Sequence, residues 1–225
     1  MPAHSTIKAN YPPEPSDCRQ CERLATFLDS VKTQYPDYHA RPVDAFGDPD
    51  AKLLIVGLAP GMHGANRTGR PFTGDYAGIL LYQTLHKFGF ASHAESVSHH
   101  DDLRLMNCRI TNAVKCLPPQ NKPNPDEIRQ CNHYLQTEIR SFLQSDGKAI
   151  LALGTIAHQA VLRGLGLRLK DYAFTHGAIY PLPDHAARLY DSYHCSRYNT
   201  QTKRLTAAMF EQIFATIAAD LLNNQ

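Results

Sequence analysis

The 225-residue chain carries 23 Lys and Arg against 21 Asp and Glu, a formal net charge of +2, and 43% hydrophobic residues. This length suffices for one sizeable core, and a near-balanced charge neither requires nor excludes nucleic acid, which is bound by local clusters of cations. No apolar run reaches the roughly 18 residues of a membrane span, and the first residues lack the apolar core of a signal peptide. We therefore expect a cytoplasmic protein without a membrane partner, whose six cysteines do not form a disulfide framework.

The polar, proline-rich residues 1–17 predict a flexible N-terminal lead, and residues 18–225 predict a single domain. The expected helices cover about 21–35, 75–88, 124–143, 155–163 and 202–222. The expected strands cover about 52–57, 109–114, 149–153, 178–182 and 189–193. Strands that alternate with helices predict an α/β fold with a mostly parallel sheet covered on both faces. Such sheets bind ligands at the carboxyl ends of their strands.

The first expected strand leads into GLAPGMHGANRTGRPFTGD, residues 57–75, which contains five glycines and two prolines. Glycines allow backbone N–H groups to approach a ligand closely. The segment has neither the Gly-Lys-Ser/Thr ending of a nucleotide-triphosphate loop nor a Gly-x-Gly-x-x-Gly pattern. It carries instead a donor, two cations, an aromatic ring and a carboxylate, on Asn66, Arg67, Arg70, Phe72 and Asp75. Asp75 also begins an expected helix, so it can serve as an N-cap.

Four cysteines have the arrangement of metal ligands. Cys18 and Cys21 form a C-x-x-C pair, Cys116 follows a strand, and Cys131 lies on a helix that begins with the capping pattern Asn-Pro-Asp-Glu. Two such pairs can hold zinc or a [4Fe–4S] cluster, and the wide second pair fits the cluster better. Four unrelated thiols are the alternative.

A second polar constellation follows the last strand, from Tyr193 to Thr206. His194 lies at the strand's end, where its side chain can face the crevice, although a histidine there can also be structural. The hydroxyls and cations that follow are expected at the start of the final helix, which is a favourable place for phosphate. Tyr198 is either a wedge or stacking ring for a base, or an ordinary surface tyrosine.

These residues resemble a known family. Gly57–Gly61 and His63–Asp75 resemble the first motif of the type-B, or family-five, uracil-DNA glycosylases, and His194-x-Ser196 with Asn199 and Lys203–Thr206 resembles their second motif. The resemblance implies a three-layer α/β/α sandwich with a central, mostly parallel sheet. It also implies removal of uracil, and in some members hypoxanthine or xanthine, from DNA.

The resemblance further implies roles for individual residues. Ala59 stands where other uracil glycosylases have an Asp or Asn that activates water, and Asp75 is the matching carboxylate. The expected catalytic residues are Asp75, His194 and Asn112. The expected substrate-binding residues are Gly57, Ala59, Gly61, Asn66, Phe72 and Ser196. The expected DNA contacts are Arg70, Arg197, Tyr198, Asn199, Lys203 and Arg204. The ligands of a [4Fe–4S] cluster are expected to be Cys18, Cys21, Cys116 and Cys131.

The predicted activity is therefore that of a monofunctional DNA glycosylase that flips out a deaminated base and hydrolyses its N-glycosidic bond, initiating base-excision repair. No lysine is placed to form a Schiff base. We expect a monomer that is associated with the nucleoid through DNA. Two other classes stay open: an iron-sulfur electron carrier or redox sensor, and a DNA-binding module without catalysis.

Overall fold

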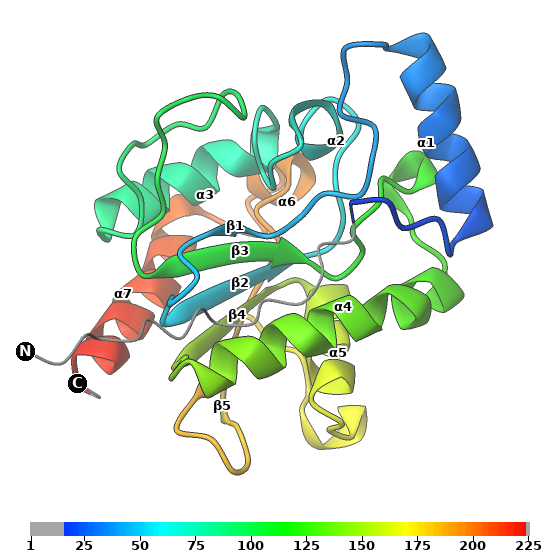
Figure 1. Cartoon of the computed structure of the whole chain (residues 1–225). Coiled ribbons are helices and arrows are strands. Elements are labelled where there is room, and N and C mark those ends of the chain that lie inside the picture. Colours follow the sequence, from blue (N-terminus) through cyan, green and yellow to red (C-terminus); the bar gives the residue numbers. More distant parts are fainter. Residues whose placement is uncertain (1–15, 224–225) are drawn as a thin grey trace, which may run out of the picture.

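The computed structural model describes residues 16–223, so the predicted N-terminal lead lies outside the described residues except for its last two positions. Within this range the chain forms a six-stranded sheet in the order β1-β3-β2-β4-β6-β5 (Figure 1). The strands are β1 (Phe46–Gly47), β2 (Leu53–Gly57), β3 (Cys108–Asn112), β4 (Ala149–Leu153), β5 (Ile179–Pro181) and β6 (Arg188–Ser192). The four central strands are parallel and the two edge strands antiparallel. The prediction of a mostly parallel sheet is confirmed.

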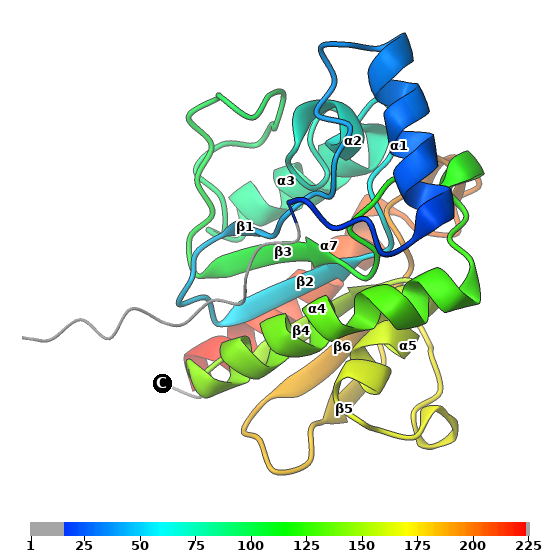
Figure 2. The ribbon, with the colours of Figure 1, turned by 45° about the vertical axis from the view of Figure 1, so that its right-hand side comes forward.

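The central strands are short apolar runs because both faces of the sheet are covered. Every residue of β2 and β4 is buried. Helices α4 (Pro125–Gln144) and α5 (Thr155–Gly164) cover one face, packing on residues such as Val56 and Ile150. Helices α3 (Tyr76–Lys87) and α7 (Ala207–Asn223) cover the other, packing on residues such as Leu53 and Leu151. Figure 2 shows these two layers on opposite sides of the sheet, which confirms the three-layer α/β/α sandwich.

Three further helices lie around this sandwich: α1 (Glu22–Gln34), α2 (Ala65–Thr68) and α6 (Arg197–Gln201). Short 3₁₀ turns, η1 and η2, cover Pro119–Asn121 and Leu169–Asp171. The described residues include no helix that is both long and apolar enough to cross a bilayer. The very short β1 and α2 gave no periodic signal in the sequence and were not predicted.

The final helix begins later than predicted. The polar stretch from Ser196 to Thr206 contains two N-caps rather than one. The Ser196 hydroxyl accepts a hydrogen bond from the Asn199 N–H at 3.4 Å and opens α6, and the Thr206 hydroxyl accepts from the Met209 N–H at 3.2 Å and opens α7. Between them Lys203 has a positive φ of 57°, which breaks the helix. The prediction of one helix over 202–222 was therefore wrong at its start.

Candidate active site

A cavity of about 420 Å³ opens at the carboxyl edge of the sheet. Parallel strands end together there, because Gly57 of β2 pairs in register with Asn112 of β3. The loop after β2, the start of α3, the end of β3 and the segment after β6 all contribute to the wall. The cavity brings together eight of the predicted residues: Ala59, Gly61, Phe72, Asp75, Asn112, His194, Ser196 and Arg197.

Two aromatic rings form one side of this cavity. Phe72 stacks on His194 with ring centroids 5.8 Å apart and an interplanar angle of 29°. Phe72 has a φ of 54°, an uncommon conformation for a bulky residue. The Tyr82 hydroxyl donates to the carbonyl of Pro71 at 2.9 Å and helps to hold this turn. Strained backbone of this kind is held in place by its surroundings and is frequent at functional sites.

Gly57 allows Phe72 and Asn112 to approach the backbone of β2. A Cβ at residue 57 would lie 2.7 Å from Phe72 Cζ and would also overlap Asn112 Oδ1. The Asn112 side chain is buried, and its Oδ1 has no hydrogen-bond partner among residues 16–223. A buried polar atom that stays unpaired is costly, so a polar ligand in the cavity would be stabilised by it.

The two carboxylate oxygens of Asp75 have different surroundings: one caps a helix and the other faces the glycine loop. Its Oδ1 accepts a hydrogen bond from the Gly78 N–H at 2.8 Å, which caps α3. Its Oδ2 lies against the glycine loop, where a Cβ at Gly64 would be 2.6 Å away. Burial raises the pKa of Asp75, opposed by the N–H groups of Gly78 and Ala77. The cap predicted from the sequence is confirmed, and the same carboxyl group also lines the cavity.

His194 is half-buried in the cavity wall, and desolvation of its ring lowers its pKa to about 4. The ring is therefore neutral at physiological pH and carries a single N–H. Its Nδ1 has no hydrogen-bond partner within the described part of the chain. The Asn199 side chain donates from Nδ2 to the His194 carbonyl at 2.8 Å. Asn199, which is predicted to contact DNA, thus also fixes the backbone that carries His194.

Three predicted residues of the first motif are absent from the cavity wall: Gly57, Asn66 and Arg70. Asn66 is completely buried. Arg70 is 2% exposed, and its guanidinium pairs with Asp101 at 2.6 Å and donates to the hydroxyls of Ser96 at 2.7 Å and Thr73 at 2.9 Å. The prediction that Arg70 contacts DNA phosphate is therefore corrected, because all these partners are internal and the side chain has no free surface.

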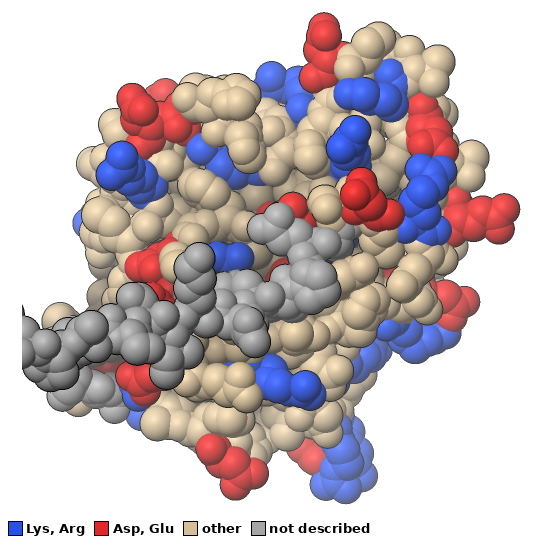
Figure 3. All heavy atoms as spheres, in the orientation of Figure 1, with Lys and Arg blue, Asp and Glu red and all other residues tan. Residues whose placement is uncertain are grey.

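The other predicted DNA contacts, Arg197, Tyr198, Lys203 and Arg204, are exposed on the segment that follows His194. Tyr198 is 69% exposed. The Arg197 guanidinium lies 5.8 Å from the centre of the Tyr76 ring, and that of Arg204 lies 4.6 Å from the centre of the Tyr193 ring. Elsewhere, on the face seen in Figure 3, basic and acidic side chains are interspersed rather than gathered into one basic patch.

The structure adds five residues to the cavity lining that sequence reasoning missed, and two of them, Tyr76 and Asn121, have polar side chains. Tyr76 follows the cap of α3, and Asn121 ends the 3₁₀ turn η1 with a φ of 56°. Asn121 lies in the run Pro-Pro-Gln-Asn-Lys-Pro, which looked like an ordinary connection. Its only signal was an asparagine, a residue type that adopts positive φ more often than most non-glycine residues.

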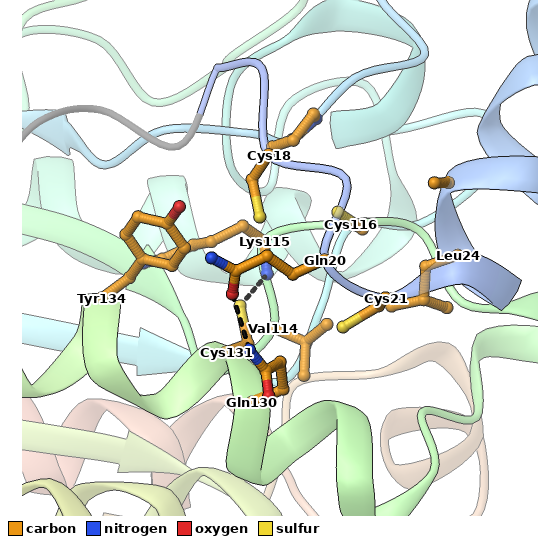
Figure 4. A pocket seen from close by; sticks show the side chains of 12 residues that line it. Cys18, Gln20, Cys21, Leu24, Val114, Lys115, Cys116, Gln130, Cys131 and Tyr134 are labelled. Atoms are coloured by element: carbon orange, nitrogen blue, oxygen red, sulfur yellow. Dashed lines mark hydrogen bonds between the residues drawn. The ribbon is translucent and has the colours of Figure 1, made fainter.

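The four predicted ligand cysteines line a single pocket (Figure 4). They come from the segment that leads into α1, the loop after β3, and α4. The backbone N–H of Lys115 donates to Cys131 Sγ at 3.3 Å. Burial raises the pKa of Cys116 to about 12 and that of Cys131 to about 11. Among residues 16–223 no group of three His, Cys, Asp or Glu side chains is arranged to hold a metal ion.

Comparison with known proteins finds one family model and several relatives whose names agree with that family. The family model described as "Uracil DNA glycosylase superfamily" matches residues 45–218. The chain is 49% identical over 201 residues to a type-5 uracil-DNA glycosylase of Thermus thermophilus, covering 87% of this chain and 90% of that protein. It is 38% identical over 208 residues to a type-5 uracil-DNA glycosylase of Pyrobaculum aerophilum, covering 91% and 89%. A type-4 uracil-DNA glycosylase of Archaeoglobus fulgidus is 30% identical over 164 residues, covering 72% and 67%.

Proposed function

Because the chain belongs to the uracil-DNA glycosylase superfamily and is 49% identical to a type-5 enzyme of that superfamily, we propose that its cavity receives a base flipped out of DNA. The protein excises uracil by hydrolysing the N-glycosidic bond and so acts in DNA repair. The observation that carries this proposal is the convergence of Phe72, Asp75, Asn112 and His194 on one cavity. Two of these side chains, Asn112 and His194, present buried polar atoms without partners among the described residues.

Substrate recognition follows from the chemistry of the wall. A base inside a duplex cannot be attacked, and turning it out costs a few kcal/mol. The Phe72 ring offers a face on which the extruded base stacks, and the Asn112 amide can pair with the polar edge of uracil. Arg197, Tyr198, Lys203 and Arg204 would hold the backbone or fill the gap in the stack, offsetting the cost of flipping.

Bond cleavage leaves positive charge on the sugar and negative charge on the departing base. Asp75 can stabilise the sugar cation and orient water, a role for which Ala59 has no polar side chain. Neutral His194 can donate its N–H to the carbonyl oxygen of the uracil anion, and loss of such a donor typically costs about 10²–10³ in rate. The lining contributed by residues 16–223 includes no lysine, which supports a monofunctional mechanism without a Schiff base.

We propose that Cys18, Cys21, Cys116 and Cys131 hold a [4Fe–4S] cluster. The support is a donor set of four thiols around one pocket and an N–H that already points at the sulfur of Cys131, as is usual around cluster thiolates. When bound, the cluster would supply a cross-link between distant segments rather than a reaction step. Cys108 and Cys195, which are buried elsewhere, would not take part. A monomer that acts at the nucleoid is part of the same proposal.

The activity is tested on duplexes that each carry one deaminated base, uracil, hypoxanthine or xanthine. After incubation with the protein, hot alkali cleaves the strand wherever a base has been removed. We expect alkali-dependent cleavage at uracil and none without alkali. An electron carrier, or a DNA-binding module without catalysis, would leave all three duplexes intact, and cleavage at hypoxanthine or xanthine would widen the substrate range.

A further inference from the structure

A second groove of about 490 Å³ adjoins the active-site cavity. It runs between α3 and the segment around residues 95–97, and it shares Asp75 and Tyr76 with the cavity. Three large apolar side chains in it are exposed: Tyr76 at 44%, Ile79 at 54% and Val97 at 59%. Tyr76 and Ile79 are one turn apart on the outer face of α3, so the groove presents an apolar surface directly beside the candidate catalytic carboxylate.

The far wall of this groove is held by hydrogen bonds to Asp101 and to the glycine loop. Asp101 accepts hydrogen bonds from the backbone N–H groups of Val97, at 3.0 Å, and Ser98, at 3.2 Å, while it pairs with Arg70. The Gly74 N–H donates to the Ser96 carbonyl at 3.1 Å and ties this wall to the glycine loop. Val97 is therefore exposed on an ordered segment, and binding there would cost little ordering entropy.

The chemistry of the groove suits the face of a base better than a phosphate. Glu95 lies in the groove and would repel an anion, while the exposed side chains of Tyr76, Ile79 and Val97 offer an apolar surface against which a base can stack. A cation lies where the groove meets the cavity, because Arg197 lines the cavity and lies over the Tyr76 ring. A phosphate that joins two nucleotides would meet that guanidinium.

We propose that this groove is a subsite for the base adjacent to the flipped uracil on the same strand, which stacks against Tyr76, Ile79 and Val97. The proposal rests on the proposed function, since it takes the uracil cavity as its reference point. Because the groove and the cavity share Asp75 and Tyr76, they adjoin each other. The group that reaches the groove is therefore the nucleotide next to the flipped one. The rate of excision then depends on the presence of a neighbouring base that can stack in the groove. It does not depend on hydrogen bonds to the edge of that base.

The test is a double-mutant cycle in which each protein variant and the wild type are compared on the same set of DNA duplexes. Single-turnover excision rates at subsaturating enzyme are measured on a uracil duplex with normal neighbours, and on duplexes with a tetrahydrofuran abasic analogue either 5′ or 3′ to the uracil. We expect Ile79→Ser to lower the rate about fivefold on the normal duplex, in line with the loss of one stacking contact. On one of the two abasic-neighbour duplexes the Ile79→Ser and wild-type rates should agree, since the contact is already missing. Val97→Ser should behave in the same way.

Ile179→Ser is the matched control, because Ile179 is 41% exposed on the distant edge strand β5. It should leave the ratio between the duplexes at its wild-type value. If Ile79→Ser lowers the rate equally on all duplexes, or on none, the subsite is overturned and the groove serves another occupant, such as a protein partner. If the wild type removes uracil from none of the duplexes, the proposed function fails and the subsite with it. Uracil removal without coupling overturns the subsite alone.

Discussion

At Gly57 a single hydrogen atom separates the backbone of β2 from the two side chains proposed to recognise the base. The stacking ring of Phe72 and the amide of Asn112 both occupy the space that a side chain would need. The glycine is thus required by close approach rather than by positive φ. Gly61 differs, since a Cβ there would come no nearer than 3.9 Å to the carboxyl group of Asp75.

The first prediction concerns this difference. Gly57→Ala should lower the single-turnover rate of uracil excision by at least tenfold, because Phe72 and Asn112 must shift away from the base. Gly61→Ala should have a much smaller effect. Binding of both variants to an undamaged duplex should match the wild type, since the exposed cations are untouched. Equal rates for Gly57→Ala and the wild type would show that the two side chains have room to move.

His194 should make stability depend on pH. Its pKa is about 4 in the folded protein against 6.5 ordinarily, so the unfolded chain takes up a proton between these values while the folded chain does not. The neutral ring's contribution to the free energy of unfolding is therefore fully present above about pH 6.5. It is lost as the pH falls to 4. The wild type should therefore lose up to about 3 kcal/mol more than His194→Gln between pH 7 and 4. Melting curves of both proteins across this range test this, and parallel profiles would contradict it.

At the scale of the elements, β3 and α4 are joined by a buried ion pair. Lys115, in the loop after β3, contacts Glu138 of α4 at 2.7 Å and also donates to the Thr111 hydroxyl, which in turn donates to Glu138 at 2.8 Å. The Lys115 and Glu138 side chains are 1% and 9% exposed. A buried pair adds little net stability over apolar residues, but loss of one partner strands the other charge.

Glu138→Leu should therefore destabilise the protein by about 3–5 kcal/mol. For a chain of this size such a loss lowers the Tm by about 10 °C. The double variant Lys115→Met/Glu138→Leu should recover most of the Tm, because no unpaired charge is left. Thermal melting of the three proteins decides the matter, and a double variant no more stable than Glu138→Leu would show that the charges themselves are needed.

The elements also show what the sequence could and could not predict. The central strands and the start of α4 were predictable because apolar runs and the capping pattern are local; the Glu127 carboxylate does accept from the Asn124 N–H, at 2.6 Å. Arg70 was misassigned because the residues around it in the sequence do not reveal its ion-pair partner Asp101, which lies 31 residues away. Asn121 was missed because it reaches the cavity only through the path of the long loop between β3 and α4. No local sequence pattern specifies that path.

At the scale of the whole molecule, the four-cysteine pocket connects segments that are up to 113 residues apart in sequence, between Cys18 and Cys131. Arg23 of α1 adds a second link, since its Nε lies 2.7 Å from Glu127 of α4. The loop between Cys116 and α4 also carries Asn121 to the active-site cavity. A cluster bound to these thiols would therefore stabilise the arrangement of α1, α4 and this loop together.

Protein purified without oxygen should accordingly contain about four irons per chain. Cys131→Ser should lose the iron and melt at a lower temperature, because the cross-link is gone. Cys108→Ser is the control, since that thiol is buried on the side of the sheet covered by α3 and α7 and lies outside the pocket. Elemental analysis that finds one zinc and no iron would remove the cluster hypothesis.

The central claim is that Asp75 serves catalysis as well as capping α3, and Asp75→Asn separates the two roles. Asparagine caps helices about as well as aspartate, so the fold and the Tm should be preserved. Without the negative charge, single-turnover excision from a uracil-containing duplex should fall at least a hundredfold, while the affinity for that duplex stays at the wild-type value. An Asp75→Asn protein that melts normally and excises uracil at the wild-type rate would contradict the account, since Asp75 would then be a cap alone.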